Sequence, residues 1–151
     1  MAEVDTLKEI VQKKKEKLLL AKQSLPEDEL KEKVKVLSQS RPFIEAINKP
    51  HNICLIAEIK KASPSSGVIR GDFNHQEIAR IYQEAGAQAI SVLTEEDYFG
   101  GDISYINEIK SLVSLPILRK DFIFEPYQVY ESRLFGADAI LLIAQLLTKE
   151  Q

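Results

Sequence analysis

Two patterns of hydrophobic and polar residues follow one another along the chain, with the change near residue 51. Up to that point apolar residues recur every three or four positions, and this spacing predicts amphipathic helices. We expect a long helix from Val4 to Gln23, a second after Pro26 and a short third after Pro42. Their predicted buried positions are Val4, Leu7, Val11 and Leu18, then Leu30, Val34 and Leu37, then Phe43, Ile44 and Ile47. The lysines from Lys13 to Lys15 are interpreted as a solvated helix face.

After His51 short apolar runs alternate with helical patterns. The runs predict strands from Ile53 to Ile59, Gln88 to Leu93, Pro116 to Lys120 and Ala139 to Ile143. The patterns between them predict helices near Gln76 to Ala85, Ile103 to Ser111 and Pro126 to Phe135. Short buried strands that alternate with helices are typical of a parallel sheet with right-handed crossovers. We therefore expect an α/β protein, with residues 1–50 as an N-terminal helical extension and residues 51–151 as the strand and helix units.

One segment occurs twice in nearly the same form. Gly86-Ala87-Gln88-Ala89-Ile90 returns as Gly136-Ala137-Asp138-Ala139-Ile140. Each copy sits where a helix is expected to end and a strand to begin, a place that suits glycine. A repeat of two strand and helix steps fits a barrel or a doubly wound sheet. A common helix-to-strand joint of small residues would explain the likeness as well.

Composition and charge narrow the function classes. The chain has 151 residues, enough for one domain of ordinary size, and 44% of them are hydrophobic. The net charge of -3 comes without a dense basic stripe, so no nucleic-acid partner is predicted. No apolar run approaches the roughly 18 residues that span a bilayer, and the N-terminus lacks the features of a signal peptide. We expect a cytoplasmic protein with no membrane partner, in which the single cysteine, Cys54, is a small core residue.

The candidate chemistry lies at the ends of two predicted strands. Glu58 and Lys60 share one face of the first strand because side chains alternate between faces, and Lys120 ends the third strand. Charges placed there cost free energy unless they pair or bind something. In an eight-stranded barrel the inward side chains of alternate strands form layers, so the three residues could meet at the carboxyl end and bind an anionic substrate. The alternative is a pair of surface lysines where loops begin.

The residues around these charges form an ordered set of motifs. They are Ile56-Ala57-Glu58-Ile59-Lys60-Lys61-Ala62-Ser63-Pro64-Ser65-Ser66-Gly67, Ser91-Val92-Leu93-Thr94, Tyr98-Phe99-Gly100-Gly101, Leu118-Arg119-Lys120-Asp121-Phe122, Tyr127-Gln128 and Gly136-Ala137-Asp138-Ala139-Ile140-Leu141-Leu142-Ile143. In sequence and order they closely resemble the indole-3-glycerol phosphate synthase family, from about residue 41 to the end. The helices before them resemble the N-terminal extension of that family.

This resemblance implies a (βα)8 TIM barrel, of which the chain would form about the first four units. The family closes the indole ring of 1-(2-carboxyphenylamino)-1-deoxyribulose 5-phosphate in tryptophan biosynthesis and releases carbon dioxide and water. It uses no cofactor and no metal. The implied partner is therefore a phosphorylated anthranilate substrate, and the implied activity is that of a carbon-carbon lyase.

The resemblance also implies roles for single residues. Lys120 would be the general acid at the substrate carbonyl, and Lys60 would contact the substrate carboxylate and also act as an acid. Glu58 would organise both lysines. The implied substrate-binding residues are Ser63 in the loop beside the substrate and Phe99, Phe122 and Leu141 around its aromatic ring.

Other expectations concern the extent of the chain. The remaining catalytic residues of the family and its phosphate-binding loops would follow residue 151, so we expect an incomplete chain without appreciable synthase activity of its own. Thr148 to Gln151 has the form of a capping box, which predicts the start of a further helix. One alternative is another phosphate-binding barrel such as phosphoribosylanthranilate isomerase, which the helices before the first strand and the Lys-Ala-Ser-Pro-Ser loop disfavour. The other is a non-enzymatic half-barrel that self-associates through open sheet edges.

Overall fold

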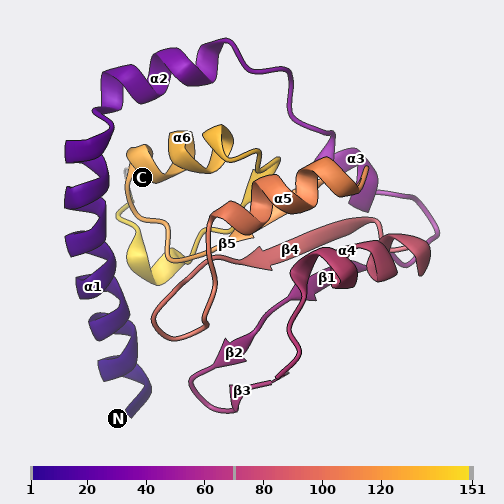
Figure 1. Cartoon of the computed structure of the whole chain (residues 1–151), viewed down its shortest axis with the longest axis horizontal. Coiled ribbons are helices and arrows are strands. Elements are labelled where there is room, and N and C mark those ends of the chain that lie inside the picture. Colours follow the sequence, from indigo (N-terminus) through magenta and orange to yellow (C-terminus); the bar gives the residue numbers. More distant parts are fainter. Residues whose placement is uncertain (1, 70, 150–151) are drawn as a thin grey trace.

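The computed structural model describes residues 2–69 and 71–149, with side chains described from residue 6 onward. Three helices come first: α1 (Ala2–Ser24), α2 (Glu27–Lys35) and α3 (Phe43–Ile47). They surround the remaining elements, as Figure 1 shows. The helix α1 stands beyond the carboxyl ends of the strands, α2 packs on α6 (Pro126–Leu134), and α3 lies toward the opposite end of the sheet.

Four parallel strands form the central sheet in the order β1-β4-β5-β6. The strands are β1 (Ile56–Ile59), β4 (Ala89–Leu93), β5 (Ile117–Lys120) and β6 (Ala139–Ile140). The helices α4 (His75–Glu84), α5 (Ser104–Leu112) and α6 connect them. A hairpin of β2 (Ala62–Ser63) and β3 (Gly67–Val68) follows β1, and a 3-10 turn η1 (Ala144–Leu146) follows β6. This is the predicted α/β arrangement, and it matches consecutive units of a (βα)8 barrel.

The two faces of the sheet differ in burial. On the face that packs against α4 and α5, side chains such as Ile59, Ile90 and Ile117 are at most 1% exposed. Successive residues of a strand point to opposite faces, so Glu58, the residue before Ile59, lies on the other face and is only partly buried. The packing of the outer face therefore directs Glu58 toward the inner face.

The repeated segment has the same structure in both copies. Gly86 and Gly136 follow α4 and α6 with φ angles of 85° and 97°, in the left-handed region that favours glycine. The side-chain oxygen of Gln88 accepts a backbone N–H just before β1, and that of Asp138 accepts one at the start of β5. The predicted role of glycine at these joints is confirmed, and the residue two positions later ties each joint to the preceding strand.

A single arginine attaches the N-terminal helices at the amino end of the sheet. The Arg41 guanidinium donates hydrogen bonds to the carbonyl oxygens of Lys110, Val113 and Leu115, at distances of 2.7 to 2.9 Å. Its backbone N–H donates to Asp138. Carbonyl groups at a helix end lack partners within the helix, so the guanidinium satisfies groups that the end of α5 leaves open.

Some expected boundaries were wrong. The first strand begins at Ile56 because pairing with β4 begins there, and Ile53 is 99% exposed. The last strand ends at Ile140 instead of Ile143, where its pairing with β5 ends. The hairpin of β2 and β3 was not predicted, since the Ser/Pro/Gly segment carries no alternating apolar pattern.

Three expected core positions also differ. Ile44 is 70% exposed because α3 is only five residues long and buries none of its residues. Leu37 lies beyond the end of α2 and is exposed, and Cys54 is only half-buried. Of the predicted capping box, Glu150 and Gln151 lie outside the described residues. No helix in the described part of the chain combines the length and hydrophobicity needed to cross a bilayer.

Candidate active site

The strands β1 and β5 bring three charged side chains together on the inner face. Glu58 Oε2 lies 2.5 Å from Lys120 Nζ, and Glu58 Oε1 lies 3.0 Å from Lys60 Nζ. We call these three residues the inner cluster. Between 29% and 40% of each side chain is exposed. The structure thus places the three predicted catalytic residues within one set of contacts, although their sequence positions are up to 62 residues apart.

One carboxylate in this cluster serves two ammonium groups. Partial burial works against ionisation of Glu58, but hydrogen bonds and charge interactions with Lys120 and Lys60 outweigh it and lower the pKa of this carboxyl. Glu58 is therefore ionised at neutral pH. The cluster carries one more positive than negative charge, which suits an anionic substrate.

An open groove of about 500 Å³ is lined by residues of α1 and of the segments that follow β1, β4 and β5. It contains Phe99 and Phe122, whose ring centroids are 6.3 Å apart, and Ser63 from β2. The helix α1 closes another side of this aromatic groove with Leu7 and Ile10. The structure thus brings together three of the four predicted substrate-binding residues. Leu141 follows β6, is partly buried, and is not among the described residues that line the groove.

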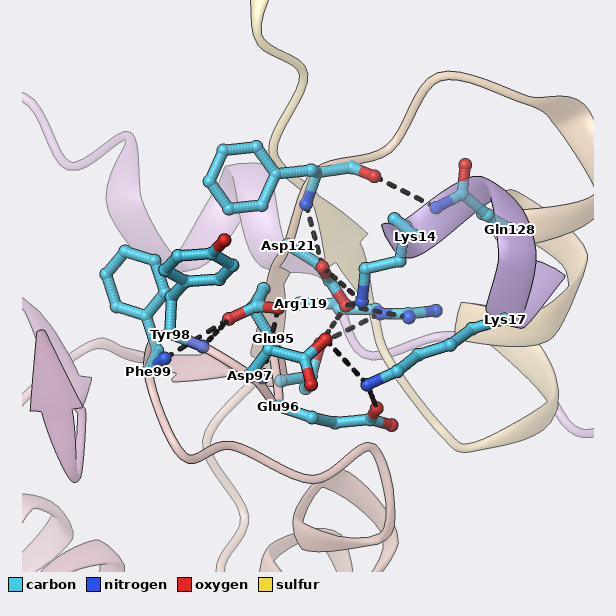
Figure 2. A network of polar contacts seen from close by, with 12 residues as sticks. Lys14, Lys17, Glu95, Glu96, Asp97, Tyr98, Phe99, Arg119, Asp121 and Gln128 are labelled. Carbon is cyan, nitrogen blue, oxygen red and sulfur yellow. Dashed lines mark hydrogen bonds and ion pairs between the residues drawn. The ribbon is translucent and has the colours of Figure 1, made fainter. Parts of the chain in front are cut away.

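A buried carboxylate holds the loop that carries Phe99. Glu95 follows β4, is 2% exposed, and accepts the backbone N–H groups of Asp97, Tyr98 and Phe99 (Figure 2). The loop returns directly over the strand end at Gly101, where an added Cβ would lie 2.4 Å from a backbone carbonyl oxygen. The position of the Phe99 ring is therefore set by Glu95 and by the missing side chain of Gly101.

A second buried carboxylate holds the loop that carries Phe122. Asp121 accepts hydrogen bonds from Thr94, Arg119, Lys14 and the backbone N–H of Phe122 (Figure 2). We call Lys14, Thr94, Arg119 and Asp121 the outer network. Although burial opposes ionisation, the neighbouring charges of Arg119 and Lys14 lower the pKa of Asp121 to about 2. Asp121 is a charged residue whose partners are all protein groups.

Lys14 corrects one prediction. The lysines from Lys13 to Lys15 were expected on a solvated face, but Lys14 is 9% exposed and its Nζ lies 2.8 Å from Asp121 Oδ1. A signal was present in the sequence, because Lys14 occupies the same helical stripe as Leu7, Val11 and Leu18. A lysine inside an apolar stripe calls for a buried acidic partner.

Several residues of this site were not predicted from the sequence to belong to it. They are Leu7, Ile10, Lys14, Thr94, Glu95 and Asp121. Each lies in α1 or just after the end of a strand, where a structural role is the simpler interpretation of a lone residue. Among the described residues, no group of three or more His, Cys, Asp or Glu side chains is arranged to hold a metal ion.

Comparison with known proteins identifies the family of this chain. The sequence model of the family described as indole-3-glycerol phosphate synthase matches residues 7–151. The chain belongs to this family. It is 49% identical over 142 residues to the indole-3-glycerol phosphate synthase of Desulforamulus reducens. The aligned residues cover 94% of this chain and 54% of that relative.

Two other relatives have the same name and are matched over a similar share of their length. The indole-3-glycerol phosphate synthase of Clostridium acetobutylicum is 51% identical over 93% of this chain and 54% of that protein, and that of Aliarcobacter butzleri is 48% identical over 96% and 56%. The chain thus spans about half the length of the curated relatives that it matches. Members of this family are carboxy-lyases of tryptophan biosynthesis with a TIM-barrel fold, and the four parallel strands seen here fit the first half of such a barrel.

Proposed function

We propose that this chain supplies the acid and carboxylate-binding part of an indole-3-glycerol phosphate synthase site. The reaction is ring closure with decarboxylation of 1-(2-carboxyphenylamino)-1-deoxyribulose 5-phosphate. The observation that carries the proposal is that Glu58 is shared between Lys60 and Lys120, whose strands lead into segments that line the aromatic groove. Family membership supports it.

The two lysines fit the demands of the first steps. The anthranilate ring carbon that bears the carboxylate attacks the substrate ketone, and a carbon-carbon bond forms as the carbonyl oxygen takes a proton. Lys120 is assigned as the donor of that proton, a role that general acids fulfil with rate gains of about 10² to 10⁴. Lys60 is assigned to the substrate carboxylate, which leaves as carbon dioxide while its bonding electrons return to the ring.

Loss of water completes the indole ring. The hydroxyl formed in the first step takes a proton and leaves as water, and Lys60 is assigned as the donor of that proton. The neighbouring carbon, which bears the nitrogen, loses a proton to solvent, and the electrons of its C–H bond form the double bond of the indole. Glu58 accepts a hydrogen bond from each ammonium group, at 2.5 and 3.0 Å, and so orients both. A preorganised pair of charges costs no rearrangement when charge develops on the substrate.

The aromatic groove is assigned to the anthranilate ring. The carboxylates of Glu95 and Asp121 hold the backbone at Phe99 and Phe122, and the two rings line the groove at defined positions. Ser63 lines the groove, and its hydroxyl is assigned to a polar group of the substrate. Leu141 follows β6, at the edge of the sheet opposite β1, and remains a candidate wall of the substrate site.

A fusion protein tests the proposal. This chain is joined to the part of the Desulforamulus reducens synthase that follows the region it matches, and indole-3-glycerol phosphate formation is measured. We expect turnover, with Lys120→Ala lowering it by at least about 10². The matched control is Lys33→Ala, which removes an exposed lysine of α2. A folded Lys120→Ala fusion with unchanged turnover would remove Lys120 from the mechanism.

Other expectations stay predictions. Self-association through the edges of β1 and β6 is tested by sedimentation at several concentrations, where a concentration-independent monomer would count against it. A cytoplasmic location, which the single cysteine supports, is tested by cell fractionation. The absence of a nucleic-acid partner is tested by a gel-shift assay at low salt.

A further inference from the structure

Asp121 stands between two residues of the proposed site. Lys120 precedes it at the end of β5, and Phe122 follows it at the start of the next loop. Lys120 points to the inner face, whereas the Asp121 side chain points away from it and is fully buried. The backbone of this one residue therefore connects the proposed proton donor with a wall of the aromatic groove.

The Asp121 carboxylate fixes that backbone. Oδ1 accepts the backbone N–H of Phe122 at 2.8 Å, and Oδ2 accepts Thr94 Oγ1 at 2.6 Å and Arg119 Nη2 at 2.9 Å. The Lys14 ammonium contacts both oxygens, at 2.8 and 3.0 Å. Moving this carboxylate would move the chain on which Lys120 and Phe122 are placed.

Lys14 is the contact of this network with the N-terminal helix, 107 residues away in the sequence. Leu7 and Ile10, which lie two turns and one turn earlier in α1 respectively, line the aromatic groove. One face of α1 thus contacts the groove directly and the loop after β5 through a charge pair. The position of α1 is therefore coupled to the site both through the groove and through the charge pair.

The other cation of the network cannot replace Lys14. Arg119 divides its guanidinium between Asp121, Glu131, Thr94 and Ser132. Lys14 and Arg119 thus carry two positive charges against the two negative charges of Asp121 and the partly exposed Glu131. Without Lys14 the group has an excess negative charge in a buried place, which favours movement of the carboxylate toward solvent.

We propose that Lys14 is a positioning residue, which fixes the Asp121 carboxylate and thereby the placement of Lys120 and Phe122. This inference rests on the proposed function, because it assigns Lys14 to the same site. Displacements of about 1 Å at reacting groups can lower rates by about 10², so the contact matters for catalysis as well as for the fold.

Nuclear magnetic resonance on the chain of residues 1–151 tests the proposal without turnover. Lys14→Met keeps the length of the side chain and removes its charge. We expect the Phe122 amide to exchange about tenfold faster, because its acceptor is no longer held. We also expect the Glu58 pKa to rise toward its ordinary value, because Lys120 is less firmly placed against it.

Two further variants complete the test. Lys17→Met is the matched control, since Lys17 lies one turn along α1 and pairs with the partly exposed Glu96 and Asp97 (Figure 2). It should change neither reading. Lys14→Arg keeps the charge and should restore both readings at least in part.

The outcomes separate positioning from folding. Unchanged Phe122 exchange and an unchanged Glu58 pKa in folded Lys14→Met would overturn the proposal. So would global unfolding of both Lys14→Met and Lys14→Gln, which would assign the pair to the fold as a whole. If the fusion protein loses turnover with Lys120→Ala but not with Lys14→Met, the proposed function stands and the positioning role is wrong.

Discussion

Two groups of charges lie on opposite faces at the carboxyl end of the same sheet. The inner cluster has two ammonium groups for one carboxylate, and about a third of each side chain is exposed. In the outer network the side chains of Arg119 and Asp121 are 4% and 0% exposed, and each has several protein partners. Arg119, Lys120 and Asp121 are consecutive, so the end of β5 contributes to both groups.

The difference lies in what completes each group. The outer network is complete within the protein, and its charges balance when Glu131 is included. The inner cluster has an unbalanced positive charge at the ends of strands that lead into the aromatic groove. Buried charges with a full set of partners indicate a structural role, whereas a partly exposed excess charge indicates a ligand.

The largest effect is expected from removing the acid of the outer network. Asp121→Ala leaves Lys14 buried without its partner, and loss of one partner of a buried pair costs about 3 to 5 kcal/mol. Urea unfolding should show this decrease in the free energy of unfolding. Glu29→Ala, an exposed acid of α2, is the control. A loss below about 1 kcal/mol for Asp121→Ala would contradict the structural role assigned to the outer network.

Acid should remove a smaller share of the same stability. The Asp121 pKa is about 2 in the folded chain, below the ordinary value of 3.8, so the unfolded chain binds more protons as pH falls. This stability is therefore present above about pH 4 and is lost as pH falls toward 2, with a total of about 2 kcal/mol. Urea unfolding between pH 5 and pH 2.5 measures it. Asp121→Asn should have a shallower pH dependence, and an identical slope would contradict the assignment.

Thr94 tests the network with a smaller change. Its hydroxyl donates to Asp121 and accepts Arg119 Nε, and Thr94→Val removes both contacts while keeping the shape of the side chain. We expect a loss of about 1 to 2 kcal/mol in unfolding free energy, since two buried groups lose one partner each. Thr94→Ser keeps the hydroxyl and serves as the control. Equal losses for both variants would mean that packing matters here and the hydroxyl does not.

The smallest effect on stability is expected in the inner cluster. Glu58→Gln removes the charge that pairs with Lys60 and Lys120, but partly exposed pairs contribute at most about 1 kcal/mol. The same unfolding measurement should find a change within that limit, while turnover of the fusion protein falls. A destabilisation as large as that of Asp121→Ala would show that the inner cluster also holds the fold.

The sequence predicted the inner cluster for a simple reason. Alternation along short strands is a local rule, so the shared face of Glu58 and Lys60 followed from their spacing. The position of Lys120 followed from the parallel order of the strands, which the alternating helices indicated. The structure has these residues in contact.

The outer network could not be predicted in the same way. Its pairing of Lys14 with Asp121 joins positions 107 residues apart, and it depends on how α1 packs across the strand ends. No local rule determines that packing. The hairpin of β2 and β3 was missed because its pairing involves only two residues on each side, fewer than a periodic pattern requires.

The alternation at the end of β5 also limits how this segment can change in evolution. Arg119, Lys120 and Asp121 serve different faces in turn, and β6 pairs with the same strand at Leu118 and Arg119. An insertion or deletion of one residue in β5 would turn the lysine into the core and an acid or an arginine toward the groove. Substitutions can be accepted there one at a time, whereas a change of length by one residue would disable both faces together.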